Sequence, residues 1–239
     1  MKRFARALTA AAIIVGVAAA ELQNVQVNGG AYYSYKGKQY EFKDLFNGKD
    51  LTGWWVRKQD TSPYQVKEGG ILRVTGEEPH DWLFTDGEYR DFVIRYEYRC
   101  VSGEGNSGVG IRATKEDNPA FSGMEIQVIR PGWENSWQRS GALYAAAPPA
   151  VIADRPFGEW NSVQVECIGN RVRTIMNGQE LYDIKITNYT PEFCKDVEWM
   201  KPLTGRAEKG HIAIQNHGDA VEFRNIQIAA LPDVTAEGE

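Results

Sequence analysis

Residues 160–186 read WNSVQVECIGNRVRTIMNGQELYDIKI, and this stretch decides the fold class. It contains three short runs of alternating or apolar residues, joined by Gly169-Asn170 and by Asn177-Gly178. An Asn-Gly pair between two such runs is the strongest short-range signal for a β-hairpin. We therefore expect three consecutive antiparallel strands here.

Runs of the same kind continue on both sides of this stretch. They are YQVKEGGILRV (64–74), DFVIRYEYRC (91–100), SGVGIRAT (107–114), GMEIQVI (123–129), SGALYAA (140–146), HIAIQN (211–216) and AVEFRNIQI (220–228). No long helical periodicity accompanies them, and roughly a dozen short strands separated by turns are typical of a β-sandwich. The sequence thus predicts an all-β sandwich of two antiparallel sheets, in which the first and last strands of the domain pair.

The N-terminal residues are typical of a secretory signal. Residues 1–20 have a basic start, an apolar run and three alanines for cleavage. The apolar run is shorter than the ~20 residues that span a bilayer, so we expect a periplasmic or secreted protein that leaves the membrane on cleavage; an uncleaved anchor is the alternative. A polar segment, 21–41, precedes the domain at 42–231, and an acidic tail, 232–239, follows it. Within the domain, residues 187–209 break the strand rhythm and predict a long surface loop.

Charge excludes two classes of partner. Loss of residues 1–20 reduces the basic residues from 27 to 24 and leaves all 32 acidic ones, so the mature formal charge is −8. No cluster of Lys and Arg remains, which makes nucleic acid and anionic membranes poor partners. The charge does not argue against a neutral ligand, and an aromatic content of 11% favours surfaces that stack on sugar rings.

The cysteines give no sign of chemistry. Of Cys100, Cys167 and Cys194, an exported chain could pair two. Cys167 is in phase with Val163 and Val165, and buried thiols are the simpler interpretation. There is no C-x-x-C and no Cys/His spacing typical of zinc, so the spacing supports neither a divalent metal nor another cofactor.

Polar residues fall on one face of several predicted strands, because side chains alternate between faces. In GMEIQV (123–128), Glu125 and Gln127 share the polar face. In HIAIQNHG (211–218), that face carries Gln215 and, if the strand continues, His217.

A third strand adds to this polar surface. In NSGVGIR (106–112), Asn106 and Arg112 share a face with two glycines, which keep the surface low enough for a ligand to approach. Each face taken alone could simply meet water, but together the three strands favour a polar groove. The aromatic residues that could form its rim are Trp82, Trp133, Trp137, Tyr144 and Trp199.

Several motifs carry a resemblance to a known family. FKDLFNGKDLTGWW (42–55), NSGVGIR, GMEIQV, FGEWNSVQV (157–165) and HIAIQNHGDAVEFRNIQI (211–228) occur in the order typical of the 3-keto-disaccharide hydrolase domain family. The chain resembles this family over about residues 42–231. The resemblance implies a concanavalin A-like jelly-roll sandwich that cleaves glycosides whose sugar carries a ketone at C3, so an oxidised sugar is the expected partner.

The resemblance also implies a set of polar site positions. They are Asn106, Arg112, Glu125, Gln127, Tyr144, Asn161, Gln215 and His217. Arg224 is equally typical of the family, with a structural role as the alternative. Asn216 stands where relatives often carry Asp.

The glutamate at 125 has no second carboxylate beside it. Retaining glycosidases need two carboxyl groups ~5–5.5 Å apart, and jelly-roll glucanases supply them as E-x-D-x-x-E. The corresponding residues here are Glu125, Gln127 and Arg130, so that pattern fails after its first member. Ordinary double displacement is therefore disfavoured.

A 3-keto sugar needs only one base, because the ketone acidifies the hydrogen on C2. We predict that Glu125 removes this proton and that elimination then expels the C1 substituent, with water adding back for net hydrolysis. The enolate oxygen would be polarised by Arg112, Gln127 or Gln215, and His217 or Tyr144 would protonate the leaving oxygen. The catalytic prediction is Glu125, His217 and Arg112, and the substrate-binding prediction is Asn106, Gln127, Tyr144, Asn161, Gln215 and Trp137.

Three alternatives stay open at this point. Glu125 could form a buried ion pair with Arg112. The domain could be a non-catalytic carbohydrate-binding module, since fold alone does not determine function. An ordinary endo-glucanase is disfavoured by Gln127 and Arg130.

Overall fold

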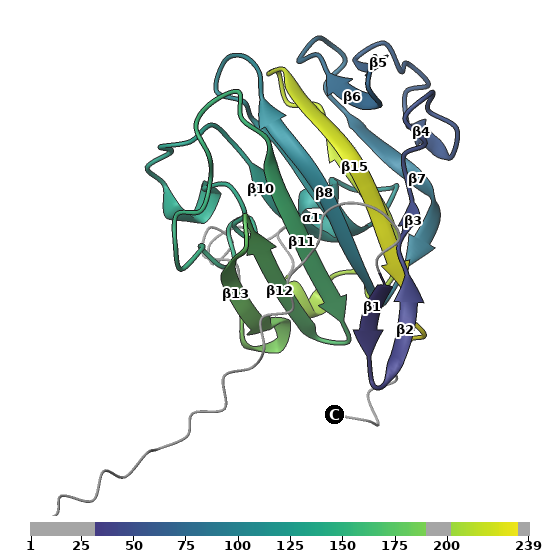
Figure 1. The fold of residues 1–239 in the computed structure, drawn as a ribbon, viewed down its shortest axis with the longest axis vertical. Helices are drawn as coiled ribbons and strands as arrows, with labels where there is room; N and C mark the ends of the chain where they lie inside the picture. The colour runs from purple at the N-terminus through teal and green to yellow at the C-terminus, as the bar shows by residue number, and fades with distance from the viewer. Residues whose placement is uncertain (1–31, 190–201, 234–239) are drawn as a thin grey trace, which may run out of the picture.

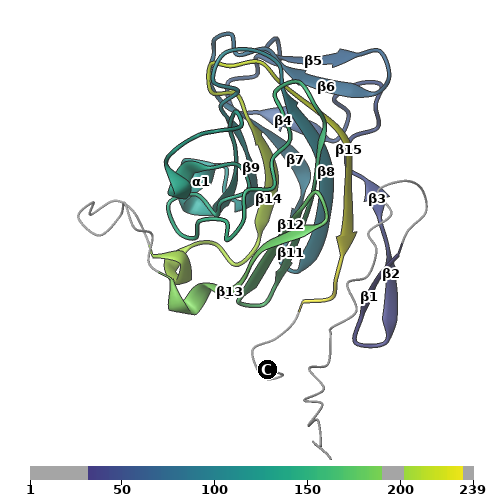
Figure 2. The same ribbon diagram turned by 60° about the vertical axis from the view of Figure 1, so that its left-hand side comes forward.

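The computed structural model describes residues 32–189 and 202–233. The predicted signal at 1–20, Cys194 and Trp199 lie outside this part of the chain. The described residues form two antiparallel sheets packed face to face, which confirms the predicted β-sandwich (Figures 1 and 2). None of the helices in these residues is long and apolar enough to cross a membrane.

One sheet has five strands. In spatial order they are β10 (Met124–Val128), β9 (Ser107–Ala113), β14 (Gly210–Gln215), β7 (Trp82–Tyr89) and β4 (Trp54–Val56). Glu125 lies opposite Gly110 and Gln127 opposite Gly108, so the two polar residues of β10 face the glycines of β9. This register creates a low surface beside the carboxylate.

The other sheet has eight strands. In spatial order they are β13 (Gln179–Lys185), β12 (Arg171–Met176), β11 (Asn161–Ile168), β8 (Phe92–Cys100), β15 (Val221–Ala230), β6 (Ile71–Val74) and β5 (Tyr64–Lys67), with β3 (Lys43–Asp44) also paired to β15. The pairing of β3 with β15 confirms that the first and last strands of the domain meet.

A separate hairpin extends from the lower end of the eight-stranded sheet in Figure 1. It consists of β1 (Tyr32–Tyr35) and β2 (Lys38–Glu41), which pair only with each other. Tyr33 and Tyr40 pack beside Phe42, on the surface of the large sheet that faces away from the sandwich.

The main core lies between the two sheets. Val109, Ile126 and Ile214 of the small sheet pack with Tyr96 and Phe223 of the large sheet in one buried cluster. These residues belong to the apolar faces predicted from the sequence, so the alternation is confirmed for β10 and for the adjoining parts of β9 and β14. The polar faces of these strands consequently point away from the core.

The structure differs from the sequence prediction in three places: one predicted strand is absent, and one strand and one helix were not predicted. The run 140–146 forms no strand; it makes turns with isolated bridges at Leu143. The strand β7 was not predicted, because WLFTDGEY is apolar only in its first half. A short helix, α1 (Pro119–Ser122), was also missed, and it packs on the outer surface of β9 and β10 (Figure 2).

The end of β9 departs from regular alternation. Gly110 pairs with Ala213 and Ala113 pairs with His211, so Ile111 and Arg112 of β9 stand opposite a single residue of β14. Such an extra residue is a β-bulge, and Arg112 has the positive φ of 51° that a bulge position can adopt. The bulge resets the alternation, so Arg112 leaves the polar face of the strand.

Two of the cysteines are described. Cys100 and Cys167 are buried free thiols, and Cys167 belongs to the core as predicted. Within residues 32–189 and 202–233, no group of three or more His, Cys, Asp or Glu side chains is arranged to hold a metal ion.

Candidate active site

A cavity of about 280 Å³ opens on the outer face of the five-stranded sheet. We call it the Glu125 pocket. Its walls are formed by Asn106, Asn118, Ala120, Phe121, Glu125, Gln127, Ile129, Trp133, Gln138, Tyr144, Gln215 and His217. The strands β9, β10 and β14, the residues that flank them and the turns at 140–146 therefore bring six of the nine residues predicted for the site to one place.

Glu125 lies in the floor of this pocket with only 3% of its surface exposed. Its Oε1 is buried and has no hydrogen-bond partner. A carboxylate removed from water without a partner is costly in its ionised form. Burial accordingly raises the pKa of Glu125 to about 8.

Gly108 makes this position of the carboxyl group sterically accessible. A Cβ at residue 108 would lie 1.9 Å from Glu125 Oε1, a distance that real atoms do not adopt. The absence of a side chain on β9 thus lets the carboxyl group lie flat against the strand.

A chain of amides leads from the pocket floor to the imidazole of His217. Gln127 Nε2 donates to the carbonyl of Val128 at 3.2 Å and to Asn106 Oδ1 at 3.0 Å. Because a carbonyl only accepts, the first bond fixes the orientation of the Gln127 amide, and the second then fixes Asn106. Asn106 Nδ2 therefore donates to His217 Nδ1 at 3.2 Å.

This chain determines the proton position on His217. Its Nδ1 accepts a hydrogen bond, so the neutral ring carries its proton on Nε2. His217 is exposed and lines the pocket. The geometry suits a group that donates a hydrogen bond from Nε2–H to a bound ligand.

Gln127 is consequently not available as the predicted polariser. Both of its N–H groups are used within the amide chain. Gln215 fits that task better, because it lines the pocket and its carboxamide carries two N–H donors. The β9 hydroxyl of Ser107 donates to the Gln215 carbonyl at 2.7 Å, which holds this part of β14 in place.

Aromatic and helical groups form the remaining walls. Tyr144 accepts a hydrogen bond from Gln138 Nε2 at 3.5 Å, and its ring packs against Phe121 with centroids 6.2 Å apart. Trp133 lies on the same side of the pocket. Asn118 begins α1 and accepts from the Ala120 amide at 3.1 Å, so it is both a helix cap and a wall of the site.

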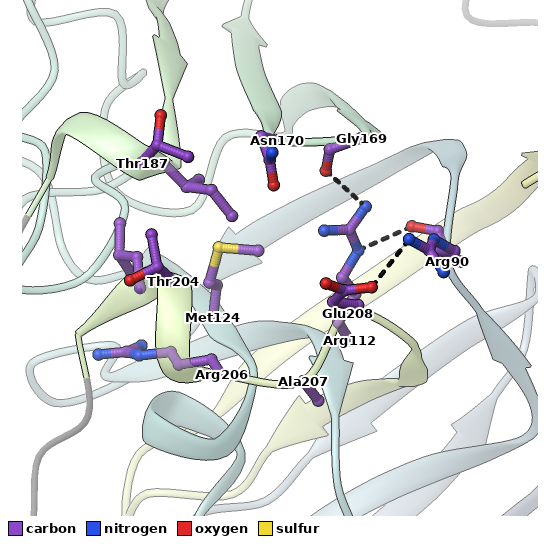
Figure 3. Close-up of a pocket in the computed structure, with 12 residues that line it drawn as sticks. Arg90, Arg112, Met124, Gly169, Asn170, Thr187, Thr204, Arg206, Ala207 and Glu208 are labelled. Atoms are coloured by element: carbon purple, nitrogen blue, oxygen red, sulfur yellow. Dashed lines mark hydrogen bonds and ion pairs between the residues drawn. The ribbon is translucent and has the colours of Figure 1, made fainter. Parts of the chain in front are cut away.

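The prediction that Arg112 shares this groove is wrong. Arg112 lines a different cavity together with Met124, which belongs to the apolar face of β10 (Figure 3). Its guanidinium donates to the carbonyls of Arg90 at 2.7 Å and Gly169 at 3.0 Å and pairs with Asp91 Oδ1 at 3.2 Å. The bulge in β9 is the physical reason, and the alternative of a Glu125–Arg112 ion pair is excluded by the same geometry.

Two other predicted residues also lie outside the pocket. Asn161 opens β11 in the other sheet, where its Oδ1 accepts from the Arg155 amide and from Asn177 Nδ2, both at 2.8 Å. Trp137 lies in the 3-10 helix η1 (Ser136–Gln138) and is not part of the pocket wall. Asn161 is a structural residue, and the neighbouring Trp133 takes the place predicted for Trp137.

Arg224 is likewise structural. Its Nε donates to Glu97 Oε2 at 2.5 Å, and its guanidinium lies 4.0 Å from the centre of the Trp160 ring. Both contacts are on the outer face of the eight-stranded sheet, so the arginine does not reach the pocket.

Sequence reasoning missed the walls supplied by Asn118, Phe121 and Gln138. For Asn118 a signal exists, because Asn followed by Pro119 is typical of a helix start. A helix of four residues is too short to show periodicity, and nothing in the sequence marks Gln138.

Three known proteins are similar to this chain in sequence or in fold. A curated 3-keto-disaccharide hydrolase of Bacteroides thetaiotaomicron is 26% identical and aligns with 78% of this chain and 77% of its own. The crystal structure of a proposed glycosyl hydrolase of Parabacteroides distasonis superposes with a TM-score of 0.69 and 27% identity, covering 80% of this chain and 94% of the other. A Bacillus subtilis protein with a galectin-like fold has a TM-score of 0.50 at 13% identity and supports the fold alone; it covers 81% of this chain and all of its own.

A family profile also matches the chain. The profile of the 3-keto-alpha-glucoside-1,2-lyase-like domain matches residues 41–229. Because this range includes both sheets of the sandwich and the whole Glu125 pocket, the chain belongs to the family of 3-keto-alpha-glucoside-1,2-lyase-like domains.

Proposed function

We propose that the protein is an enzyme that cleaves glycosides whose sugar carries a ketone at C3, with 3-keto-disaccharides as the substrate class. The observation that carries the proposal is a single buried carboxyl group, Glu125, whose pKa is raised to about 8 in a pocket that also holds His217. The family and the name of the curated relative support the same substrate class.

The reaction begins at C2 of the oxidised ring. Ionised Glu125 removes the C2 proton, and the electron pair of the broken C–H bond forms an enolate with the C3 ketone. When the enolate collapses, C1 and C2 form a double bond and the bond from C1 to the glycosidic oxygen breaks. The leaving oxygen takes the proton that Glu125 removed from C2, so the elimination is balanced without a second carboxylate.

Two further residues complete the proposed mechanism. An amide N–H of Gln215 stabilises the negative charge that develops on the C3 oxygen, a task that hydrogen-bond donors perform best in a site shielded from water. His217 donates a hydrogen bond from Nε2–H to the leaving oxygen and stabilises the negative charge that develops there until the proton arrives from Glu125. All three groups line the same pocket.

The released sugar has two fates. Addition of water across the new double bond gives net hydrolysis: Glu125, ionised again, takes a proton from the water whose oxygen bonds to C1 and delivers that proton to C2. Without that addition the unsaturated sugar is the product. The signal-like residues 1–20 lead us to place the reaction in the periplasm or outside the cell, and the steps given above use side chains alone.

Glucose release from 3-keto-trehalose or from a 3-keto-β-glucoside tests the proposal. The wild-type protein should release the leaving sugar, and Glu125→Gln should lose at least ~10²-fold in kcat/KM because it cannot take up a proton. Glu88→Gln is a matched control, since Glu88 is exposed on a neighbouring strand of the same sheet. Binding of the 3-keto sugar without any release would instead indicate a carbohydrate-binding module.

A further inference from the structure

A second cavity adjoins the Glu125 pocket on the outer face of the same sheet. It measures about 560 Å³ and lies toward β7, with Asp81 in its wall, so we call it the Asp81 pocket. Three residues, Asn118, Gln215 and His217, line both cavities. The two spaces are therefore neighbouring parts of one cleft with the imidazole at their junction.

Unpaired hydrogen-bond acceptors gather in the wall of the Asp81 pocket. Asp81 Oδ2, Gln215 Oε1 and Asn216 Oδ1 are buried and have no partner. For Asn216 the orientation is fixed, since its Nδ2 donates to the carbonyls of Glu77 at 2.6 Å and Pro79 at 3.1 Å. Buried polar atoms are normally paired, and leaving one unpaired costs about 1–3 kcal/mol.

The charged side chains in the wall of the Asp81 pocket do not favour an anionic ligand. Arg57 pairs with Asp81 at 3.4 Å, donates to the carbonyl of Asp117 at 2.9 Å and lies over the ring of Phe84 at 5.1 Å. Its guanidinium is thus held by the protein, and Glu116 and Asp117 add negative charge to the same wall. A phosphate or carboxylate ligand would meet carboxylates and acceptor oxygens.

A neutral ligand rich in hydroxyl groups fits these walls. Each of the three unpaired oxygens can accept a hydrogen bond from an O–H group, and each such bond removes the cost of an unsatisfied buried atom. Trp82 adds an aromatic surface beside Gln215, its partner across the β7–β14 pairing. Sugar rings present this combination of hydroxyl groups and an apolar face.

We infer that the Asp81 pocket is the subsite for the leaving part of the substrate, and that this part is a second, unoxidised sugar ring. The inference rests on the proposed function for the direction of the substrate: the 3-keto ring occupies the Glu125 pocket and the leaving ring occupies the Asp81 pocket. The glycosidic oxygen then lies at the junction, beside the hydrogen-bond donor His217.

Two substrates with different leaving groups test this assignment. Asp81→Asn places an amide where the unpaired carboxylate oxygen lay, so it should lower kcat/KM about tenfold or more for a 3-keto-disaccharide. For methyl 3-keto-glucoside, whose leaving group does not reach the pocket, kcat/KM should change less than about twofold. Asp86→Asn, on an exposed residue toward the other end of β7, should affect neither substrate.

A second variant covers the case in which Asp81→Asn fails to fold. Lys58 is exposed in the pocket wall, so Lys58→Trp fills the space without disturbing a buried contact. It should give the same selective loss on the disaccharide. Equal losses on both substrates, or no loss on either, would overturn the assignment.

Binding of glucose provides a readout that does not depend on turnover. Saturation-transfer NMR should detect glucose on the wild-type protein and on Asp86→Asn, with a loss of the signal in Asp81→Asn and Lys58→Trp. If neither keto substrate is cleaved but glucose binds in this pattern, the proposed function fails and the sugar subsite stands. If the substrates are cleaved but glucose binding is absent or insensitive to these variants, the subsite assignment fails alone.

Discussion

A single carboxyl group without a partner defines the site at the scale of residues. Proteins rarely bury an unpaired glutamate, because its ionised form loses hydration and gains nothing in return. Glu125 is kept in this state by Gly108 beneath it and by the pocket walls around it. The consequence is an acid–base group that titrates close to neutral pH, which is what proton transfer from carbon requires.

The rate of cleavage should follow the ionisation of Glu125. Only the ionised form removes the C2 proton, and burial raises its pKa to about 8. We therefore expect kcat/KM for a 3-keto-glycoside to increase with pH and to level off above about 8. Initial rates over the pH range measure this, and a profile that stays flat from about pH 6 to 9 would contradict the assignment of the base.

The same titration should appear in the stability of the fold. The pKa of the Glu125 carboxyl group is about 8 in the folded protein and 4.5, the ordinary value, in the unfolded chain, so the folded state binds more protons between these two pH values. The stability linked to the bound proton is complete below 4.5 and is lost as pH rises through 8. The Glu125→Gln variant does not ionise at this position. As the pH rises through this window, its free energy of unfolding should therefore increase relative to that of the wild type, by up to roughly 4 kcal/mol.

Urea denaturation of both proteins at about pH 5, 7 and 9 measures this difference. Glu88→Gln, the exposed control, should follow the wild type at each pH. A constant gap between Glu125→Gln and the wild type would show that Glu125 ionises normally in the folded protein.

The proton position on His217 is a second prediction at this scale. The amide of Asn106 donates to Nδ1, so the neutral imidazole should be the Nε2–H tautomer. Long-range ¹H–¹⁵N NMR spectra of the ring distinguish the two tautomers directly. In Asn106→Asp the carboxylate can only accept, so the proton should move to Nδ1; an Nδ1–H tautomer already present in the wild type would refute the amide chain.

At the scale of elements, the glycines of β9 determine how close the carboxylate lies to the strand. Gly108→Ala would put a Cβ 1.9 Å from Glu125 Oε1, so the carboxyl group must move. We expect a loss of about 10²-fold in kcat, since misplacement of a reacting group by ~1 Å has this effect. Gly110→Ala is the matched control on the same face: the three atoms nearest to its Cβ would belong to Ala213, Pro119 and Trp82, each at 3.3 Å, and none of them to Glu125.

Stability measurements separate these two glycine variants. Gly110→Ala should shift the unfolding midpoint through its tight contacts while the folded protein keeps its activity. If Gly108→Ala retains wild-type kcat, the carboxyl group does not need the position found here.

The alternation of side chains along strands correctly predicted which residues face the pocket. The main error, at Arg112, arose where a bulge interrupts that alternation. Glu125, Gln127 and Gln215 lie on the outer face as their spacing indicates. Arg112 does not, because the bulge adds one residue to β9 and reverses the face from that point on. A bulge depends on pairing with β14, about 100 residues further along the chain, so local spacing cannot reveal it.

At the scale of the whole molecule, Arg112 links parts of the sandwich that are distant in sequence. Its ion pair with Asp91 is almost fully buried, with the two side chains 3% and 0% exposed. Together with the carbonyls of Arg90 and Gly169, it joins β9 to the β7–β8 turn and to the β11–β12 turn (Figure 3). The arginine thus stabilises the end of the sandwich away from the chemistry.

Removal of this arginine should therefore lower the stability of the fold and leave the activity of the folded protein nearly unchanged. Arg112→Met removes the guanidinium that pairs with the buried carboxylate of Asp91, which costs about 3–5 kcal/mol. Chemical denaturation should show that loss, while kcat for a 3-keto-glycoside, measured at a temperature where the variant is folded, stays near the wild-type value. A stable but inactive Arg112→Met would restore the arginine to a catalytic role.

The sandwich and most of the pocket could be predicted from the sequence because both follow from alternation and turns. The walls contributed by Asn118, Phe121 and Gln138 could not, since they belong to a one-turn helix and irregular segments placed by tertiary packing. Asn161 was misassigned for a related reason: spacing shows that it begins a strand, but not that β11 belongs to the other sheet.

Removal of the C2 proton by Glu125 is tested most directly by cleavage of a 3-keto-disaccharide in D₂O, with the C2 hydrogen of the released keto sugar followed by NMR or mass spectrometry. The original C2 hydrogen should be lost in every turnover, replaced by deuterium after water addition or absent from the unsaturated sugar, and Glu125→Gln should show neither cleavage nor exchange. A sample of the keto sugar without enzyme corrects for spontaneous exchange. Cleavage by the wild-type protein with the C2 hydrogen retained would contradict the mechanism.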